Sequence, residues 1–273
     1  QTCASSDLVE KASIAAHLKF LSSDALEGRD TPSKGQLVAA EYLRTQLERY
    51  GVQAFDEYPD YYQPVSMEKV VKPSAGTIRL DSVLFSIEED FLLLNGGDLD
   101  LSSSMVFLQD ASSDDIKSAD VKGKIVVTNA GDGETENARA WFGMMRDKQA
   151  AAKEAGALAL VELYNSAQLP WSLLVRYFSG ERVGLDQGDS EDSFPVIWIN
   201  NPNQERSELF VSSDSVDVKT SGSEITPFEV YNVVGYVEGT DAELKKEHVV
   251  FSAHYDHVGI GQPDSTGDVI YNG

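Results

Sequence analysis

Apolar residues recur at helical spacing in two stretches near the start of the chain. The stretch DLVEKASIAAHLKFLSS predicts a first helix, with Ser6 or Asp7 as its N-cap. The stretch QLVAAEYLRTQLERYGV predicts a second helix that stops at Gly51. A polar break, ALEGRDTPSKG, separates them. His17 lies in the first helix, where we expect a partly buried structural histidine.

From about Tyr61 the pattern changes to short β-rich runs separated by clusters of Asp, Ser and Gly. These runs predict strands at TIRLDSVLFSI, SMVFLQ, KIVVTNA, ALALVELY and FPVIWIN. One helix is predicted at MMRDKQAAAKEAGA, ending at Gly156, and a short one at NQERSELF. The segment PWSLLVRYFSG (Pro170–Gly180) is interpreted as an aromatic and apolar loop. Core packing or a simple turn is the favoured explanation, and a place beside a substrate cleft is the alternative.

Two further apolar runs follow a Ser/Thr/Pro connection. NVVGYVEG begins at Asn232, and EHVVFSA covers Glu247–Ala253. Near-continuous apolar runs are typical of strands buried on both faces of an α/β sheet. The order of elements predicts an α/β domain interrupted by another domain. We expect N-terminal helices in residues 1–60, a β-rich insertion in residues 61–225 and the start of an α/β domain in residues 226–273.

The charge of the chain excludes several classes of partner. With 22 basic and 45 acidic residues among 273, the formal net charge is −23. A field of this sign repels phosphate backbones and anionic lipid, so we expect no nucleic-acid partner. No apolar run approaches the length of a membrane span. The acidic cluster DQGDSED (Asp186, Asp189, Glu191, Asp192) misses the spacing of a calcium loop and is interpreted as a solvated loop.

The single cysteine, Cys3, excludes an internal disulfide and a cysteine-based zinc site. The chain begins with Gln1, which is consistent with secretory cleavage or with the design of the expressed protein. A lipidated Cys3 is the weaker alternative, because a lipoprotein cysteine becomes the first residue. We expect a periplasmic or extracellular protein.

Residues with site chemistry gather in VVFSAHYDHVGIG, from Val249 to Gly261. His254 is predicted to lie at the carboxyl end of a strand, where sites form in α/β sheets. In an extended segment Asp256 lies on the same side as His254, where it would orient the imidazole or stand beside a metal. Taken alone, a His-x-Asp pair is more often structural or incidental. The glycines Gly259 and Gly261 do not predict a nucleotide loop, because no helix follows them.

Three blocks of the sequence together resemble the M28 family of zinc aminopeptidases. NVVGYVEGTD, VVFSAHYDHVGIG and GDVIYNG resemble the opening of its catalytic domain, and HLKFLSSDALEGRDTPSKGQLVAAEYLRTQLERYGV resembles its N-terminal helices. The middle, with DVKGKIVV and AGALALVELYN, resembles the protease-associated (PA) domain that many members carry as an insertion. The resemblance implies that His254 ligates one of two catalytic zinc ions and that Asp256 steadies it. It gives Tyr255 and His257 no ligand role.

The sequence lacks the metal-site motifs that follow these blocks in the family. The family continues with an Asp-Asp-Asn block, a Glu-Glu pair, a further Asp and a final His, none of which precedes Gly273. One histidine does not make a catalytic zinc site, which takes about three protein ligands. We therefore expect the N-terminal part of a zinc exopeptidase acting on peptides, inactive by itself, with the N-terminal helices and last strands poorly covered. Because these uncovered elements are able to pack against a second copy of the chain, a homodimer remains an alternative.

Two other functions remain open at this point. One is a non-catalytic PA-type protein- or peptide-binding module with vestigial peptidase flanks. The other is glutaminyl cyclase-like or carboxypeptidase-like chemistry on the same metal scaffold. Side chains beyond Gly273 discriminate among these alternatives.

Overall fold

The computed structural model describes residues 10–135, 137–186 and 194–273. The chain forms two compact units. The insert unit is Glu68–Pro227, and the flanking unit is Gln1–Met67 with Phe228–Gly273. Both helices and strands contribute to the structure, which confirms the mixed α/β class. The identification of the insert as a PA domain stays a prediction.

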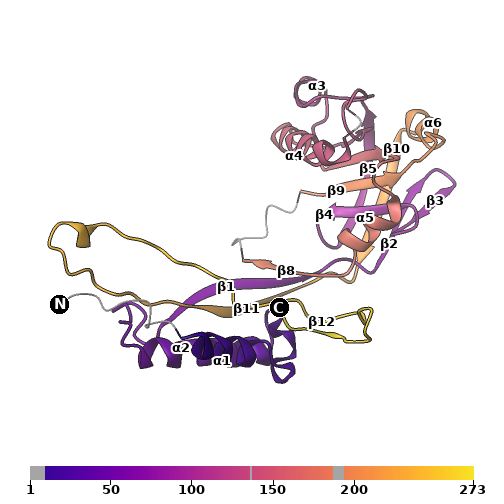
Figure 1. Ribbon diagram of the computed structural model, residues 1–273. Helices are drawn as coiled ribbons and strands as arrows, with labels where there is room; N and C mark the ends of the chain where they lie inside the picture. Colours follow the sequence, from indigo (N-terminus) through magenta and orange to yellow (C-terminus); the bar gives the residue numbers. More distant parts are fainter. Residues whose placement is uncertain (1–9, 136, 187–193) are drawn as a thin grey trace. The chain divides into compact units, whose positions relative to one another are not determined.

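The insert unit is built on an eight-stranded mixed sheet of order β3-β2-β10-β5-β6-β7-β9-β4 (Figure 1). Strands β5, β6, β7 and β9 run parallel, whereas β10 is antiparallel to β2 and β5, and β4 to β9. The strands predicted from the apolar runs are confirmed. The sheet contains β2 Ala75–Leu80, β3 Val83–Ser86, β4 Phe91–Asn95, β5 Leu99–Phe107, β6 Ile125–Asn129, β7 Ala159–Tyr164, β9 Val196–Asn200 and β10 Ser215–Ser221. Of these strands, β4 and β10 were not predicted from the sequence.

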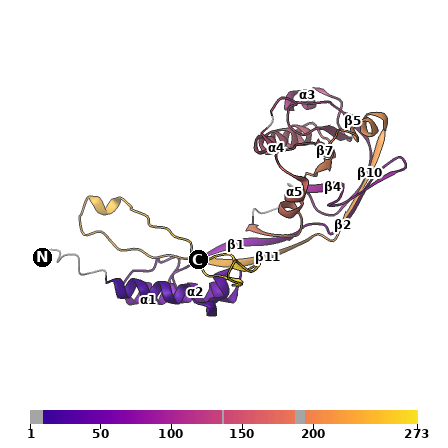
Figure 2. The same cartoon turned by 45° about the vertical axis from the view of Figure 1, so that its right-hand side comes forward.

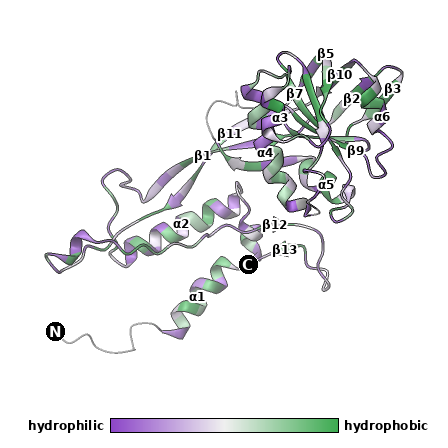
Figure 3. Ribbon diagram, turned by 90° about the horizontal axis from the view of Figure 1, so that it is seen from above, coloured by the Kyte–Doolittle hydropathy of each residue, from purple (hydrophilic) through white to green (hydrophobic). Residues whose placement is uncertain are grey.

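Both faces of this sheet are buried, so each central strand serves two cores. In β6, Val126 packs into one core, and its neighbours Ile125 and Val127 pack into the other. This alternation follows from the two-residue period of a strand. Figure 3 shows the strands of the insert unit coloured as predominantly hydrophobic. The continuous apolar runs of the sequence are explained by this double burial.

Four helices of the insert unit cover the sheet: α3 Ser113–Ser118, α4 Ala138–Glu154, α5 Trp171–Phe178 and α6 Ser207–Ser212. Residues of α3, α4 and α5 contribute to one core, and Phe210 of α6 contributes to the other (Figures 1 and 2). Helix α4 ends before Gly156, whose φ of +77° confirms the predicted stop. Residues 170–180 are not a loop, because α5 forms there, whereas the core-packing interpretation is confirmed by buried Leu174.

The flanking unit contains the two predicted N-terminal helices, α1 Lys11–Leu21 and α2 Lys34–Arg49. Tyr42 of α2 stacks on Phe20 at 4.2 Å between ring centroids, and its hydroxyl lies 2.7 Å from His17 Nδ1. His17 is therefore the structural histidine that was predicted. Ser33 caps α2 by accepting from Gln36 N at 3.1 Å. The residues predicted to cap the first helix, Ser6 and Asp7, lie outside the described residues.

The boundaries between the units fall within two strands, β1 Tyr62–Val71 and β11 Glu224–Val233. These strands form a three-stranded sheet of order β11-β1-β8, with β8 at Glu181–Leu185. The rest of the flanking unit comprises a short 3-10 helix η1 (Asp24–Arg29), a second one η3 (Leu244–Lys246), and the β12–β13 pair, Gly259–Ile260 and Ile270–Tyr271.

The structure contradicts the two strands predicted at the C-terminal side. Strand β11 ends at Val233, and residues 247–253 contain no strand at all. Val249, Val250 and Phe251 are 82 %, 83 % and 92 % exposed, in a long excursion of the chain (Figures 1 and 2). An apolar run becomes a buried strand only where neighbouring strands pair with it, and the described residues contain none beside this one.

Two further sequence predictions fall partly or wholly outside the described residues. Asp189, Glu191 and Asp192 of the acidic cluster lie in the range 187–193, and Cys3 lies in the first nine residues. Asp186, the first residue of the cluster, is described and exposed. Within the described parts of the chain, no helix combines the length and the hydropathy that crossing a membrane requires.

Candidate functional site

Residues 254–257 form an irregular loop that carries the candidate metal ligand. His254 Nδ1 lies 2.9 Å from the Asp256 carbonyl oxygen and 3.1 Å from Asp256 Oδ1. A carbonyl and a carboxylate oxygen only accept, so Nδ1 carries the ring proton and donates it. In the neutral form of the ring, the other nitrogen, Nε2, then keeps its lone pair. The His254 side chain is 78 % exposed, which leaves that nitrogen accessible.

Asp256 is also held by a residue from the N-terminal part of the chain. Thr31 Oγ1 donates to Asp256 Oδ2 at 3.3 Å, while Oδ1 faces His254. The two carboxylate oxygens thus have different partners, which limits rotation of the carboxylate. The structure brings the two predicted site residues together, although not at a strand end as expected. Their roles in metal binding stay predictions.

Arg29 holds the loop to the N-terminal helices. Its side chain is buried, and Nε donates to the Tyr255 carbonyl at 2.8 Å while Nη1 donates to the Leu21 carbonyl. Its own carbonyl accepts from His257 N at 3.1 Å. Hydrogen bonds from a charged donor contribute roughly 1.5–3 kcal/mol each. One arginine therefore connects the end of α1 to both residues that flank Asp256.

A tight turn places Arg29 in this position. Glu27, Gly28 and Arg29 all have positive φ, at 49°, 70° and 54°. A Cβ on Gly28 would lie 2.5 Å from the Gly259 carbonyl oxygen and 2.6 Å from that of Tyr271. Only glycine fits there, because the β12–β13 pair passes directly against the backbone. The glycine of the segment LEGR is thus required by the close approach of the β12–β13 backbone.

The hydroxyl of Tyr255 anchors the same loop from another direction by donating to the Tyr231 carbonyl. Burial, followed by the charge of Asp256, raises the pKa of Tyr255. The phenol is therefore neutral at physiological pH and remains a donor. His257, which the resemblance leaves without a ligand role, takes part through its backbone amide.

Sequence reasoning did not identify Arg29, Thr31 or Tyr255 as residues that hold the loop. Arg29 and Tyr255 are 226 positions apart, so no local pattern joins them. The available signal was the group LEGR followed by Asp30 and Thr31, which entered only through the family resemblance.

The residues described here do not complete a zinc site. No group of three or more His, Cys, Asp or Glu side chains suited to holding a metal occurs among them. Catalytic zinc is held by about three protein ligands with one open position. The loop offers one oriented imidazole, with Asp256 engaged at its far nitrogen. No hydrolytic step can be assigned to these residues alone.

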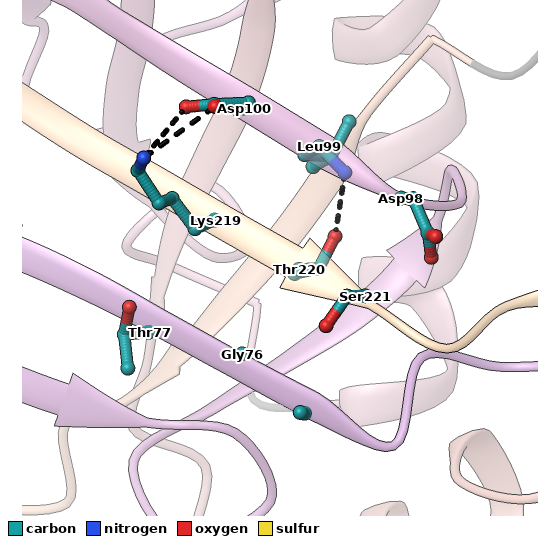
Figure 4. A pocket seen from close by; sticks show the side chains of 9 residues that line it. Gly76, Thr77, Asp98, Leu99, Asp100, Lys219, Thr220 and Ser221 are labelled. Atoms are coloured by element: carbon teal, nitrogen blue, oxygen red, sulfur yellow. Dashed lines mark hydrogen bonds and ion pairs between the residues drawn. The ribbon is translucent and has the colours of Figure 1, made fainter.

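A cleft of about 550 Å³ lies on the sheet of the insert unit, lined by residues of β2, β5 and β10. Figure 4 shows Lys219 directed at Asp100 and Thr220 beside the backbone of Leu99. Lys219 Nζ lies 3.2 Å from Asp100 Oδ1, and Leu99 N donates to Thr220 Oγ1 at 2.9 Å. Asp98 Oδ1 accepts from Ser223 N at 2.8 Å. Because its charged groups already have an ion-pair or hydrogen-bond partner, this cleft is not the candidate site.

No protein-family model matches the chain, and no curated protein matches it. Solved structures do match. An aminopeptidase from Aneurinibacillus sp. strain AM-1 matches with a TM-score of 0.48 and 17 % identity, over 81 % of this chain and 46 % of that one. A zinc aminopeptidase from Bacillus subtilis gives 0.37 and 16 %, over 83 % and 48 %. A peptidase M28 precursor from Shewanella amazonensis SB2B gives 0.37 and 16 %, over 84 % and 54 %. The chain spans about half the length of these structures, and the activities named for them are theirs.

Proposed function

We propose that this chain supplies the first metal-ligand loop of a zinc-dependent exopeptidase that removes N-terminal residues from peptides. His254 would bind zinc through Nε2, and Asp256 would hold the ring from the other side. The observation that carries the proposal is the pair of acceptors at His254 Nδ1. Zinc-binding histidines usually donate their second ring N–H to such a carboxylate or carbonyl.

The proposal assigns the remaining ligands and the general base to residues beyond Gly273. Zinc in a complete site supplies a Lewis acid and an activated water. In this chain, the loop residues orient one donor, and Arg29 and Thr31 keep the loop in place. The 273 residues alone are therefore proposed to be inactive. Secretion to the periplasm or cell exterior is part of the same proposal.

A second candidate function is a protein- or peptide-binding module. It is favoured by the insert unit, in which every residue of both buried cores belongs to Glu68–Pro227. A unit that closes its own cores does not need a peptidase site for its stability. In this alternative the His254 loop would be vestigial.

The ligand assignment is tested by ¹⁵N-edited NMR of the imidazole rings during zinc titration. We expect His254 to show the Nδ1–H tautomer and its ring signals to shift at lower zinc concentration than those of exposed His248. Asp256→Asn should weaken this response roughly 10–100-fold, as loss of a partner behind a zinc ligand does. His248→Gln is the matched control. Equal responses of His254 and His248 would overturn the assignment.

The enzymatic part is tested separately. The 273-residue chain with zinc should hydrolyse leucine p-nitroanilide no faster than its His254→Gln variant. Hydrolysis that the unaltered chain performs and the variant does not would contradict the proposal that the metal site is incomplete. Reading the natural coding sequence past the codon for Gly273 then decides between the two candidate functions. An Asp-Asp-Asn block and a Glu-Glu pair would support the peptidase, and a stop codon there would leave the binding module.

A further inference from the structure

The flanking unit contains a second cleft, of about 530 Å³, with an aromatic wall and an acidic rim. The wall is formed by Tyr58, Tyr62 and Tyr231, and the rim by Glu57 and Asp60. Two prolines, at positions 59 and 64, complete the lining. A volume of this size is typical of pockets for small ligands or side chains. None of these residues belongs to residues 254–257 or to the insert unit.

The two rim carboxylates have no internal counter-charge. Glu57 and Asp60 are exposed, and neither forms an ion pair or a side-chain hydrogen bond within the described part of the chain. Asp100, in the cleft of the insert unit, is instead paired with Lys219. Two unpaired carboxylates beside one cavity create a negative potential that a cation relieves.

Two of the wall tyrosines, Tyr62 and Tyr231, each donate a hydroxyl hydrogen bond to a carboxylate. Tyr62 donates its hydroxyl hydrogen to Glu41 Oε2 at 2.6 Å, and Tyr231 donates to the Glu229 carboxylate. A phenol that donates to a carboxylate gains electron density in its ring, which strengthens the negative potential over the ring face. The centroids of Tyr62 and Tyr231 lie 5.2 Å apart with their planes tilted by 44°. The rings therefore form an electron-rich corner.

The wall is held in place before any ligand arrives. Tyr58 N donates to the Phe55 carbonyl at 2.8 Å, and Tyr61 N donates to the Tyr58 carbonyl at 2.9 Å. The Tyr61 hydroxyl donates to the Val52 carbonyl at 2.7 Å. A preformed wall lowers the entropy that binding costs.

We propose that this cleft binds the cationic side chain of an arginine or lysine residue in a peptide. The ring faces and the carboxylates would take the charged group, and the prolines would contact its methylene stem. The net charge of −23 favours approach of such a peptide. The carbonyl of Tyr231 also accepts from Tyr255, so the cleft adjoins the loop that carries His254. The proposal does not depend on a metal at His254.

The test uses the 273-residue chain and two small probes, followed by NMR titration. N-acetyl-arginine N-methylamide carries the charge, and N-acetyl-citrulline N-methylamide has the same shape without it. We expect the arginine probe to bind roughly tenfold more tightly, as a partly desolvated cation–π contact implies. Its chemical-shift changes should be confined to residues 57–64 and 231. The lysine analogue should behave like the arginine probe.

Variants separate the charge from the rings. Glu57→Gln with Asp60→Asn keeps the shape and should weaken arginine binding about tenfold. Tyr58→Leu removes one ring of the wall and should also weaken binding. Glu89→Gln with Asp214→Asn, two exposed carboxylates of the insert unit, makes the same charge change elsewhere. Equal binding of the citrulline probe, or equal affinity of the two double variants, would overturn the proposal.

Discussion

A buried ion pair in the insert unit sets up a quantitative stability prediction. Lys148 of α4 is 3 % exposed and Glu162 of β7 is fully buried. Lys148 Nζ donates to Glu162 Oε1 at 3.1 Å and to the carbonyls of Asn129 and Gly131. Trp198 Nε1 donates to the other oxygen of Glu162 at 2.7 Å. Every polar atom of the pair is thus satisfied by protein groups.

Lys148→Met keeps the apolar stem and removes the charge. Glu162 then retains only the Trp198 hydrogen bond, and two backbone carbonyls lose their donor. Breaking a buried pair by removing one partner costs about 3–5 kcal/mol. We therefore expect the free energy of unfolding of the insert unit to fall by about 4 kcal/mol. With a urea m-value of about 2 kcal/mol/M, the unfolding midpoint moves down by about 2 M.

The chain provides its own reporter for this measurement. All three tryptophans, Trp141, Trp171 and Trp198, lie in the insert unit, so tryptophan fluorescence during urea unfolding follows that unit alone. Lys219→Met is the matched control, because the Lys219–Asp100 pair is exposed and such pairs contribute about 0–1 kcal/mol. A loss below about 1 kcal/mol for Lys148→Met, or one equal to the control, would refute the buried-pair argument.

The same variant has a defined pH dependence. Burial raises the pKa of the Glu162 carboxyl, and the positive charge of Lys148 opposes this rise. In Lys148→Met the opposing charge is gone, so folded Glu162 holds its proton to higher pH than the unfolded chain does. Its contribution is complete below the unfolded pKa of about 4.3 and is lost as pH rises through the folded pKa. Stability of the variant relative to wild type should therefore decrease with increasing pH.

Two further predictions concern the flanking unit. Gly28→Ala places a Cβ 2.5 Å from the Gly259 carbonyl oxygen and should accelerate amide exchange at His257 by about 10–100-fold, corresponding to roughly 1–3 kcal/mol of strain. The control Gly51→Ala has a similar φ of +71° but open space around it. Burial and the hydrogen bond to Glu41 together raise the pKa of Tyr62 to about 12. Glu41→Gln should lower the midpoint of Tyr62 ionisation, measured by ¹³Cζ NMR, and an unchanged midpoint would show that burial alone sets it.

The secondary structure of the insert unit was largely predictable from the sequence because its strands are buried on both faces. Runs such as KIVVTNA and FPVIWIN have consecutive apolar residues at 125–127 and 196–199, and the two cores take alternate residues from each. The same signal failed at EHVVFSA. That run has an equivalent composition, yet no strand among the described residues pairs with it. Composition identifies the capacity to form a strand, and pairing decides whether one forms.

The candidate site was predictable only in part. His254 and Asp256 are two residues apart, and their contact follows from local spacing. The residues that hold them, Arg29 and Thr31, are more than 220 positions away, and the contact depends on a positive-φ turn. A single sequence contains no information on which distant residue closes such a contact.

The long separation between Arg29 and Tyr255 has a consequence for synthesis on the ribosome. The flanking unit is split, and its halves meet through long-range contacts such as this one, which spans 226 residues. The insert unit is contiguous, and its sheet contacts are complete before Tyr255 leaves the exit tunnel. Helices α1 and α2 therefore emerge before the insert unit, and Arg29, which lies between them, contacts Tyr255 only after the whole insert unit has been synthesised.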